Sequence, residues 1–131
     1  MPTETVRVID SAIDCPPLPL VRGQGQARAV IWPGNGAAHR SFQLIELGPG
    51  ASSIDMRHPA DCVYYVITGA GRVVDLDNAA AQALGEGNMI HIDAGDGYRL
   101  EADAAAGMTV LGGSCPADPA LYAGLASKEN V

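Results

Sequence analysis

The amino-acid sequence predicts an all-β, single-domain fold, of the sandwich or jelly-roll kind, from three observations. The chain has 131 residues, the usual size of one domain, and 47% of them are hydrophobic, which is enough for one packed core. Sixteen glycines and nine prolines are scattered without a repeat, which favours short elements and tight turns over long helices. Strand-like runs recur at short intervals, and a jelly roll leaves few exposed strand edges.

Eight runs rich in β-branched, aromatic or alternating apolar residues are predicted to be strands. In chain order they are Thr5–Ile9, Ala27–Trp32, Ser41–Leu47, Cys62–Thr68, Arg72–Asp77, Asn88–Asp93, Tyr98–Glu101 and Met108–Leu111. Glycine-rich turns separate them at 33–36, 48–50, 69–71, 85–87 and 95–97. None of the Gly-x-Gly triplets continues to a third glycine or opens a helical pattern, so they predict hairpin turns and not a nucleotide site.

The two ends of the chain have a different character. Residues 1–26 are predicted to be an N-terminal arm, in which Asp14–Pro19 is an extended edge or a linker that wraps the barrel, because its prolines cannot donate ladder hydrogen bonds. Near the other end, a capping aspartate precedes a first-turn proline in Asp118-Pro119. This pair predicts a short C-terminal helix at about 117–126, with its turns from Pro119 to Ala126 and a polar tail behind it.

Charge and cysteine usage exclude several classes of function. Eight basic and fifteen acidic residues give a net charge of −7, which repels nucleic-acid phosphates and anionic lipids. The longest strongly apolar stretch, Cys62–Ile67, is too short to span a bilayer, and the N-terminus lacks a signal-peptide pattern, so we expect a cytoplasmic protein. Cys15, Cys62 and Cys115 form no Cys-x-x-Cys pair, which predicts reduced thiols and no closed zinc site.

Two segments in the middle of the chain resemble the two motifs of the cupin superfamily. Residues 50–71, Gly-Ala-Ser-Ser-Ile-Asp-Met-Arg-His-Pro-Ala-Asp-Cys-Val-Tyr-Tyr-Val-Ile-Thr-Gly-Ala-Gly, follow the frame of the first motif, a glycine, five residues, His-x-His, three or four residues, Glu, six residues and Gly. Residues 87–102 begin Gly-Asn-Met-Ile-His-Ile-Asp-Ala-Gly-Asp-Gly-Tyr, in the frame of the second motif, Gly, five residues, Pro-x-Gly, two residues and His. The resemblance implies one small RmlC-like cupin domain over 1–131, a jelly-roll barrel with a short C-terminal helix.

The metal-binding positions of these motifs are mostly changed. Met56 stands where the family has its first histidine, and His58 keeps the second. Cys62 replaces the glutamate, Tyr98 replaces the third histidine and Asp93 replaces the proline of the second motif. A divalent iron, manganese or zinc site needs three to four converging ligands, so the resemblance implies a pocket without a metal cofactor. If a metal is present, its ligands are expected to be His58 with Cys62 or His91.

Strand alternation places the candidate residues on shared faces. Met56 and His58 share one face, as do Cys62, Tyr64 and Val66, and the resemblance makes this face the cavity wall. His91 lies on the stripe opposite Ile90 and Ile92 and is either a surface or a pocket residue. The other candidates for substrate contact are Trp32, His39, Arg40, Gln43 and Arg99, among which Gln43 is favoured for the pocket because it alternates with Phe42 and Leu44.

The retained histidine predicts a metal-independent enzyme that performs proton transfer on a small organic substrate, as an isomerase, lyase or cyclase. His58 is expected to be the general base or proton shuttle and Tyr98 the acid or hydrogen-bond donor, since burial tunes both groups. Met56, Cys62, Tyr64, Gln43, Val66 and His91 are expected to contact the substrate.

Two alternatives stay open at this point: a non-catalytic cupin that only holds a small ligand, and a metal-dependent, oxygenase-like cupin with an unusual ligand set. Cys62 is expected to be a pocket wall first and a nucleophile second. The resemblance also implies a homodimer formed through edge strands or the N-terminal arm.

Overall fold

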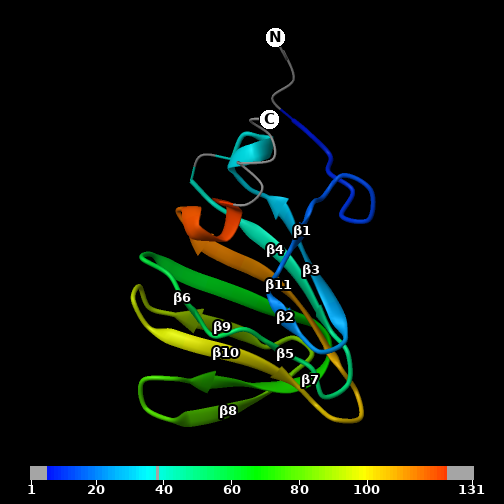
Figure 1. The fold of residues 1–131 in the computed structure, drawn as a ribbon, viewed down its shortest axis with the longest axis vertical. Helices are drawn as coiled ribbons and strands as arrows, with labels where there is room; N and C mark the ends of the chain where they lie inside the picture. The colour runs from blue at the N-terminus through cyan, green and yellow to red at the C-terminus, as the bar shows by residue number, and fades with distance from the viewer. Residues whose placement is uncertain (1–5, 38, 124–131) are drawn as a thin grey trace.

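The structure is a computed structural model that describes residues 6–37 and 39–123. The described chain forms a curled antiparallel sheet of eleven strands, together with the 3-10 turn η1 and a short helix at 119–123 (Figure 1). The elements in chain order are β1 (Pro17–Leu18), β2 (Val21–Arg22), β3 (Gly25–Ile31), η1 (Pro33–Asn35), β4 (Phe42–Leu47), β5 (Ser52–Ser53), β6 (Met56–Arg57), β7 (Asp61–Asp75), β8 (Ala80–Gly85), β9 (Met89–Ile92), β10 (Gly97–Ala102) and β11 (Met108–Cys115).

Strand β7 connects the two layers of the curled sheet. Its first part, from Asp61 to Gly69, pairs with β11 and β9, and its second part, from Ala70 to Asp75, pairs with β8 and β10. The first layer therefore has the order β1-β3-β4-β11-β7-β9, and the second continues from β7 through β10 to β5 and β2. In the second layer β6 pairs with β10 and β8 pairs with β7.

Two glycines allow β7 to pass from one layer to the other. Gly69 has φ +85°, and a Cβ atom on it would collide with the carbonyl oxygen of Gly107. A Cβ atom on Gly71 would collide with the carbonyl oxygen of Glu101. The hairpin turn predicted at 69–71 is absent, because these glycines serve close strand approach within the continuous strand β7, whereas the positive φ expected of a glycine there is found at Gly69.

The core lies between the two layers and follows the period of two along each strand. Cys62, Tyr64 and Val66 of β7 are fully buried, whereas Tyr65 and Ile67 face outward and are 44% and 40% exposed. The other large side chains of the core come from all parts of the sheet. They include Leu18, Leu20, Trp32, Ile45, Leu47, Met56, Ile90, Ile92, Tyr98, Leu100, Met108, Val110 and Tyr122.

Most predicted strands are confirmed, and the exceptions have physical reasons. The described part of Thr5–Ile9 is not a strand, and Val6 and Val8 are 86% and 94% exposed. Strand β8 was not predicted, because its alanine-rich and largely exposed sequence shows no alternation of apolar and polar residues.

The predictions for the two ends of the chain are confirmed where the structure describes them. The proline-rich segment is an edge, since β1 pairs only with β3 at one end of the first layer. The predicted helix is present at 119–123, and its remainder at 124–126 lies outside the described residues.

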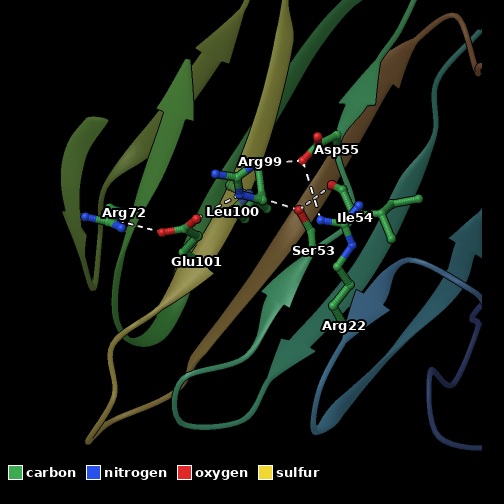
Figure 2. Close-up of polar contacts among 8 residues, drawn as sticks. All are labelled: Arg22, Ser53, Ile54, Asp55, Arg72, Arg99, Leu100 and Glu101. Atoms are coloured by element: carbon green, nitrogen blue, oxygen red, sulfur yellow. Dashed lines mark hydrogen bonds and ion pairs between the residues drawn. The ribbon is translucent and has the colours of Figure 1, made fainter. Parts of the chain in front are cut away.

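A polar network on the outer face of the second layer fixes β10 against its neighbours (Figure 2). Arg99 donates to Asp55 beside β6 and to Glu101 on its own strand, each at 2.8 Å. Arg72 of β7 donates to the other oxygen of Glu101 at 2.6 Å. The hydroxyl oxygen of Ser53 accepts the backbone N–H of Leu100 at 2.9 Å. These contacts set which side of β10 faces inward, and the inward side includes Tyr98.

Candidate functional site

His58 lies in the interior, directly after β6. It follows Met56 by two residues, and both side chains are buried, with exposed fractions of 4% and 5%. Both ring nitrogens of His58 have partners: Nδ1 lies 2.8 Å from Oδ2 of Asp118, and Nε2 lies 2.7 Å from the hydroxyl of Tyr98. The imidazole is therefore held between a carboxylate and a phenol, away from bulk water.

The Tyr98 hydroxyl is the meeting point of the buried polar side chains. Besides Nε2 of His58, it contacts the hydroxyl of Tyr64 at 2.7 Å, Sδ of Met56 at 3.7 Å and Sγ of Cys62 at 3.8 Å. Tyr98 comes from β10, Tyr64 and Cys62 come from β7, and Met56 comes from β6. The curl of the sheet thus gathers three strands around one oxygen atom.

The Asp118 carboxylate sets the direction of the hydrogen bonds. Burial raises the pKa of Tyr98 and of Tyr64 well above the ordinary value, so both hydroxyls are neutral at pH 7. Because a carboxylate only accepts, Nδ1 of His58 carries the hydrogen that it donates to Asp118, and Nε2 of the neutral imidazole then accepts from Tyr98. Tyr64 donates to the oxygen of Tyr98. The result is a continuous chain of donors from Tyr64 to the Asp118 carboxylate.

Cys62 borders this chain as a protonated thiol. Burial raises its pKa to about 11, an effect that the nearby polar hydroxyls of Tyr98 and Tyr64 only partly oppose. A thiol of this pKa is a poor nucleophile near pH 7, because the thiolate is the reactive form. Cys62 therefore contributes a wall to the site, in line with its predicted first role.

Asp118 is a site residue that the sequence analysis did not include. The sequence identified it only as a helix cap, and the structure confirms that role, since Oδ1 accepts the backbone N–H of Ala120 at 3.0 Å. Its other oxygen, Oδ2, holds His58. Asp118 is only 6% exposed, so the second oxygen of its carboxylate needs a hydrogen-bond partner inside the fold. That partner, His58, is sixty residues away in the chain, and a local sequence pattern cannot reveal it.

A pocket of about 220 Å³ opens between strands β7, β8, β9 and β10. Its apolar lining includes Val73, Leu84, Ile90 and Ile92, and Tyr98 forms part of its wall. His58 is not among the described residues that line this pocket. Tyr98 therefore belongs both to the pocket wall and to the hydrogen-bond chain of His58.

The structure brings together five of the predicted site residues, namely Met56, His58, Cys62, Tyr64 and Tyr98. Gln43 and Val66 are also fully buried in the interior.

The remaining candidates are dispersed. His91 points outward on β9 with a side chain that is 60% exposed, lies 3.4 Å from Asp93 and is one of the residues that line the pocket. Its predicted role as a metal ligand beside His58 is therefore wrong, because alternation along β9 puts it on the opposite face. Arg99 faces outward, and His39 and Arg40 are exposed.

The donor set around Tyr98 does not fit the metal that this kind of barrel commonly holds. Both nitrogens of His58 are engaged, the Cys62 thiol is protonated, and Met56 offers only a weak thioether. Within residues 6–37 and 39–123, no group of three or more His, Cys, Asp or Glu side chains is arranged to hold a metal ion. We therefore derive no chemical step through a metal.

Comparison with known proteins identifies a domain model and several solved structures. The family model described as "Cupin domain" matches residues 43–111. The polyketide cyclase RemF from Streptomyces resistomycificus has a TM-score of 0.72 at 18% identity, over 88% of this chain and 82% of that one. A predicted oxalate decarboxylase from Thermotoga maritima has a TM-score of 0.65 at 19% identity, over 81% and 96%.

An RmlC-like cupin from Shewanella frigidimarina has a TM-score of 0.65 at 13% identity, over 86% of this chain and 93% of that one. At these identities the structures are evidence for the fold. No curated protein matches the sequence. No helix among the described residues is long and apolar enough to cross a membrane.

Proposed function

Because the chain belongs to the cupin superfamily and keeps a histidine in its barrel, we propose that it is a metal-independent enzyme of proton-transfer chemistry, of the isomerase, lyase or cyclase type. One observation carries the proposal: the Tyr98 hydroxyl lies 2.7 Å from Nε2 of His58, and Tyr98 also forms part of the pocket wall. A substrate in the pocket meets Tyr98 first, with His58 behind it.

In the first step, Tyr98 takes a proton from a carbon next to a carbonyl group of the substrate. As it does so, its own hydroxyl proton passes to Nε2 of His58, and the electron pair of the C–H bond moves into an enolate. In the second step the imidazolium returns its proton to Tyr98, which protonates the enolate at its α-carbon or, where a C=C double bond is conjugated with it, at the γ-carbon. Elimination of a leaving group or attack on a second carbonyl group starts from the same enolate.

The neighbours of this pair have supporting roles. Asp118 stabilises the imidazolium that forms on His58 and keeps the ring in the Nδ1–H tautomer. Tyr64 donates to the Tyr98 oxygen at 2.7 Å and so stabilises the negative charge that develops there. The similarity in fold to a polyketide cyclase is consistent with chemistry that starts from an enolate.

Solvent exchange tests this proposal without knowledge of the substrate. The protein is incubated in D₂O with a panel of small enolisable ketones, including 4-hydroxyphenylacetone, and deuterium uptake at the α-carbon is followed by NMR. His58→Gln and Tyr98→Phe are each expected to slow the catalysed exchange by about 10² to 10⁴, the usual contribution of a positioned acid or base. Tyr65→Phe, on the outer face of the first layer, is the matched control that keeps the wild-type rate.

Exchange that stays at the wild-type rate in His58→Gln and Tyr98→Phe would contradict the proposed roles. Binding of a ketone with no exchange above the buffer rate would instead favour the non-catalytic, ligand-holding alternative.

The homodimer and the cytoplasmic location stay predictions. The outer face of the first layer exposes Tyr65 and Ile67 of β7 and, opposite Tyr65 in the register, Met89 of β9. Exposed apolar side chains in a cluster are typical of interaction surfaces. Light scattering of wild type and of Tyr65→Asp tests association through this face, and two monomeric proteins would contradict it.

A further inference from the structure

Four buried polar side-chain atoms lack a hydrogen-bond partner among the described residues. They are Oε1 and Nε2 of Gln43, Oγ of Ser114 and the hydroxyl of Tyr122. Gln43 is 0% exposed, Ser114 is 1% exposed and Tyr122 is 4% exposed. A buried polar group without a partner destabilises the fold, so a cluster of four such atoms calls for an explanation.

The four atoms belong to one place in the fold, the end of the barrel that the C-terminal segment covers. Gln43 of β4 pairs with Gly112 of β11, and a Cβ atom on Gly113 would collide with Oε1 of Gln43. Ser114 follows on β11 and pairs with Cys62. Because Gly113 has no side chain, Oε1 of Gln43 lies over β11, close to the side chain of Ser41. The Ser41 hydroxyl donates to the carbonyl oxygen of Ser114 at 2.8 Å.

Tyr122 fills this end of the barrel with an aromatic ring. Its ring stacks on Trp32, with centroids 5.4 Å apart and planes inclined by 29°. Of the helical residues 119–123, Tyr122 alone is buried. Among the described residues, the helix is also anchored by the contact of Asp118 with His58 and by the partly buried Ala117 and Leu121. The ring stacks on the face of Trp32, and its hydroxyl interacts with the side chain of Ser41 without forming a well-aligned hydrogen bond.

We infer that this end of the barrel is a binding subsite for a flat aromatic ring with hydroxyl or carbonyl substituents, and that Tyr122 occupies it as a stand-in until the ligand arrives. The ligand ring stacks on Trp32, and its substituents pair with the carboxamide of Gln43 and the hydroxyl of Ser114. The further statement that this ligand is the substrate of His58 and Tyr98 rests on the proposed function. The existence of the subsite does not depend on the proposed function.

The test uses 4-hydroxyacetophenone as the probe and 4-isopropyltoluene as an apolar molecule of the same shape. Isothermal titration calorimetry measures affinity, and the indole N–H resonance of Trp32, the single tryptophan of the chain, reports the location of binding. In the wild type, the polar probe is expected to bind at least tenfold more tightly than the apolar one and to shift the indole resonance.

Variants separate a ligand subsite from a merely structural cluster. Gln43→Leu and Ser114→Ala are each expected to weaken binding of 4-hydroxyacetophenone, Gln43→Leu by at least tenfold, while the thermal midpoint of Gln43→Leu rises, because two unpaired polar atoms leave the core. Tyr122→Ala removes the stand-in and is expected to tighten binding at least tenfold. Gln24→Leu and Tyr65→Ala, both on the surface, are matched controls without effect.

The inference fails if the wild type binds neither probe, or binds both equally. It also fails if Gln43→Leu lowers the thermal midpoint and leaves the affinity unchanged, which is the behaviour of a glutamine held by internal water. The Gln43→Leu result decides the question even if Tyr122→Ala does not fold. Neither of these two outcomes would change the catalysed deuterium exchange, so the subsite and the proposed enzymatic function are tested independently.

Discussion

The imidazole Nδ1 of His58 lies 2.8 Å from Oδ2 of Asp118, sixty residues further along the chain, and both side chains are buried. This contact joins the first cupin motif to the C-terminal segment. It closes one end of the barrel and fixes the orientation of the one histidine in the site.

Asp118→Asn is expected to reverse the His58 tautomer. An asparagine amide that turns its N–H₂ toward Nδ1 favours Nε2–H, which cannot accept from Tyr98. Nitrogen-15 NMR of the His58 ring should show this change, and catalysed exchange should fall by at least about 10². Asp93→Asn, beside the exposed His91, is the matched control. An unchanged ring spectrum would show that Asp118 does not set the tautomer.

Tyr98→Phe is expected to destabilise the fold. The change leaves Nε2 of His58 and the hydroxyl of Tyr64 without their 2.7 Å partner, at a cost of about 1–3 kcal/mol in the free energy of unfolding. Urea denaturation measures the loss. Tyr65→Phe, on the outer face of the same sheet, should change the free energy of unfolding by less than about 0.5 kcal/mol. Equal values for the two variants would contradict the network.

Cys62 is expected to resist alkylation at neutral pH and to weaken the fold at high pH. Iodoacetamide at pH 8 should label the exposed Cys115 and spare the buried Cys62. Because folding raises the Cys62 pKa to about 11, the unfolded chain loses this proton first, and the free energy of unfolding falls as pH rises through the interval up to about 11. Cys62→Ala should flatten that part of the pH profile. Labelling of Cys62 as fast as Cys115 would refute the burial argument.

Acid is expected to weaken the outer network of the second layer. Arg99 and then Arg72 hold the pKa of Glu101 below its ordinary value, so this stabilisation is present above the unfolded pKa of about 4.3 and is lost as pH falls through the folded pKa. Glu101→Gln should remove up to about 1 kcal/mol at pH 7 and less at pH 3, since the pairs are partly exposed. Glu86→Gln serves as the control. An equal effect of Glu101→Gln at both pH values would argue against ion pairing.

The sequence predicted the parts of the fold that depend on local period. Ala27–Trp32, Ser41–Leu47 and Asn88–Asp93 correspond to β3, β4 and β9 within one or two residues, because alternating burial leaves a period of two in the sequence. The two runs on either side of Gly69 gave no sign that they form one strand. Glycine marks both turns and close approaches, and only the partner strands distinguish the two.

The candidate site was predictable where alternation and the motif frame agree. Met56, His58 and Cys62 were placed on inward faces, and the structure has them there. Asp118 and Tyr122 could not be found in this way, because their contacts with His58 and Trp32 join segments far apart in the chain. The local sequence shows only that the cap residue Asp118 is followed four positions later by the aromatic Tyr122.

The single strand that belongs to both layers also governs how the molecule unfolds. Cys62 and Tyr64 lie in one half of β7, while the other half pairs with β10, where Tyr98 is opposite Asp75. Neither layer can detach without separating the groups of the site, so the barrel has no independent subdomain. Loss of circular dichroism and loss of the buried hydrogen-bond chain should therefore occur at one denaturant concentration, as a single all-or-none transition.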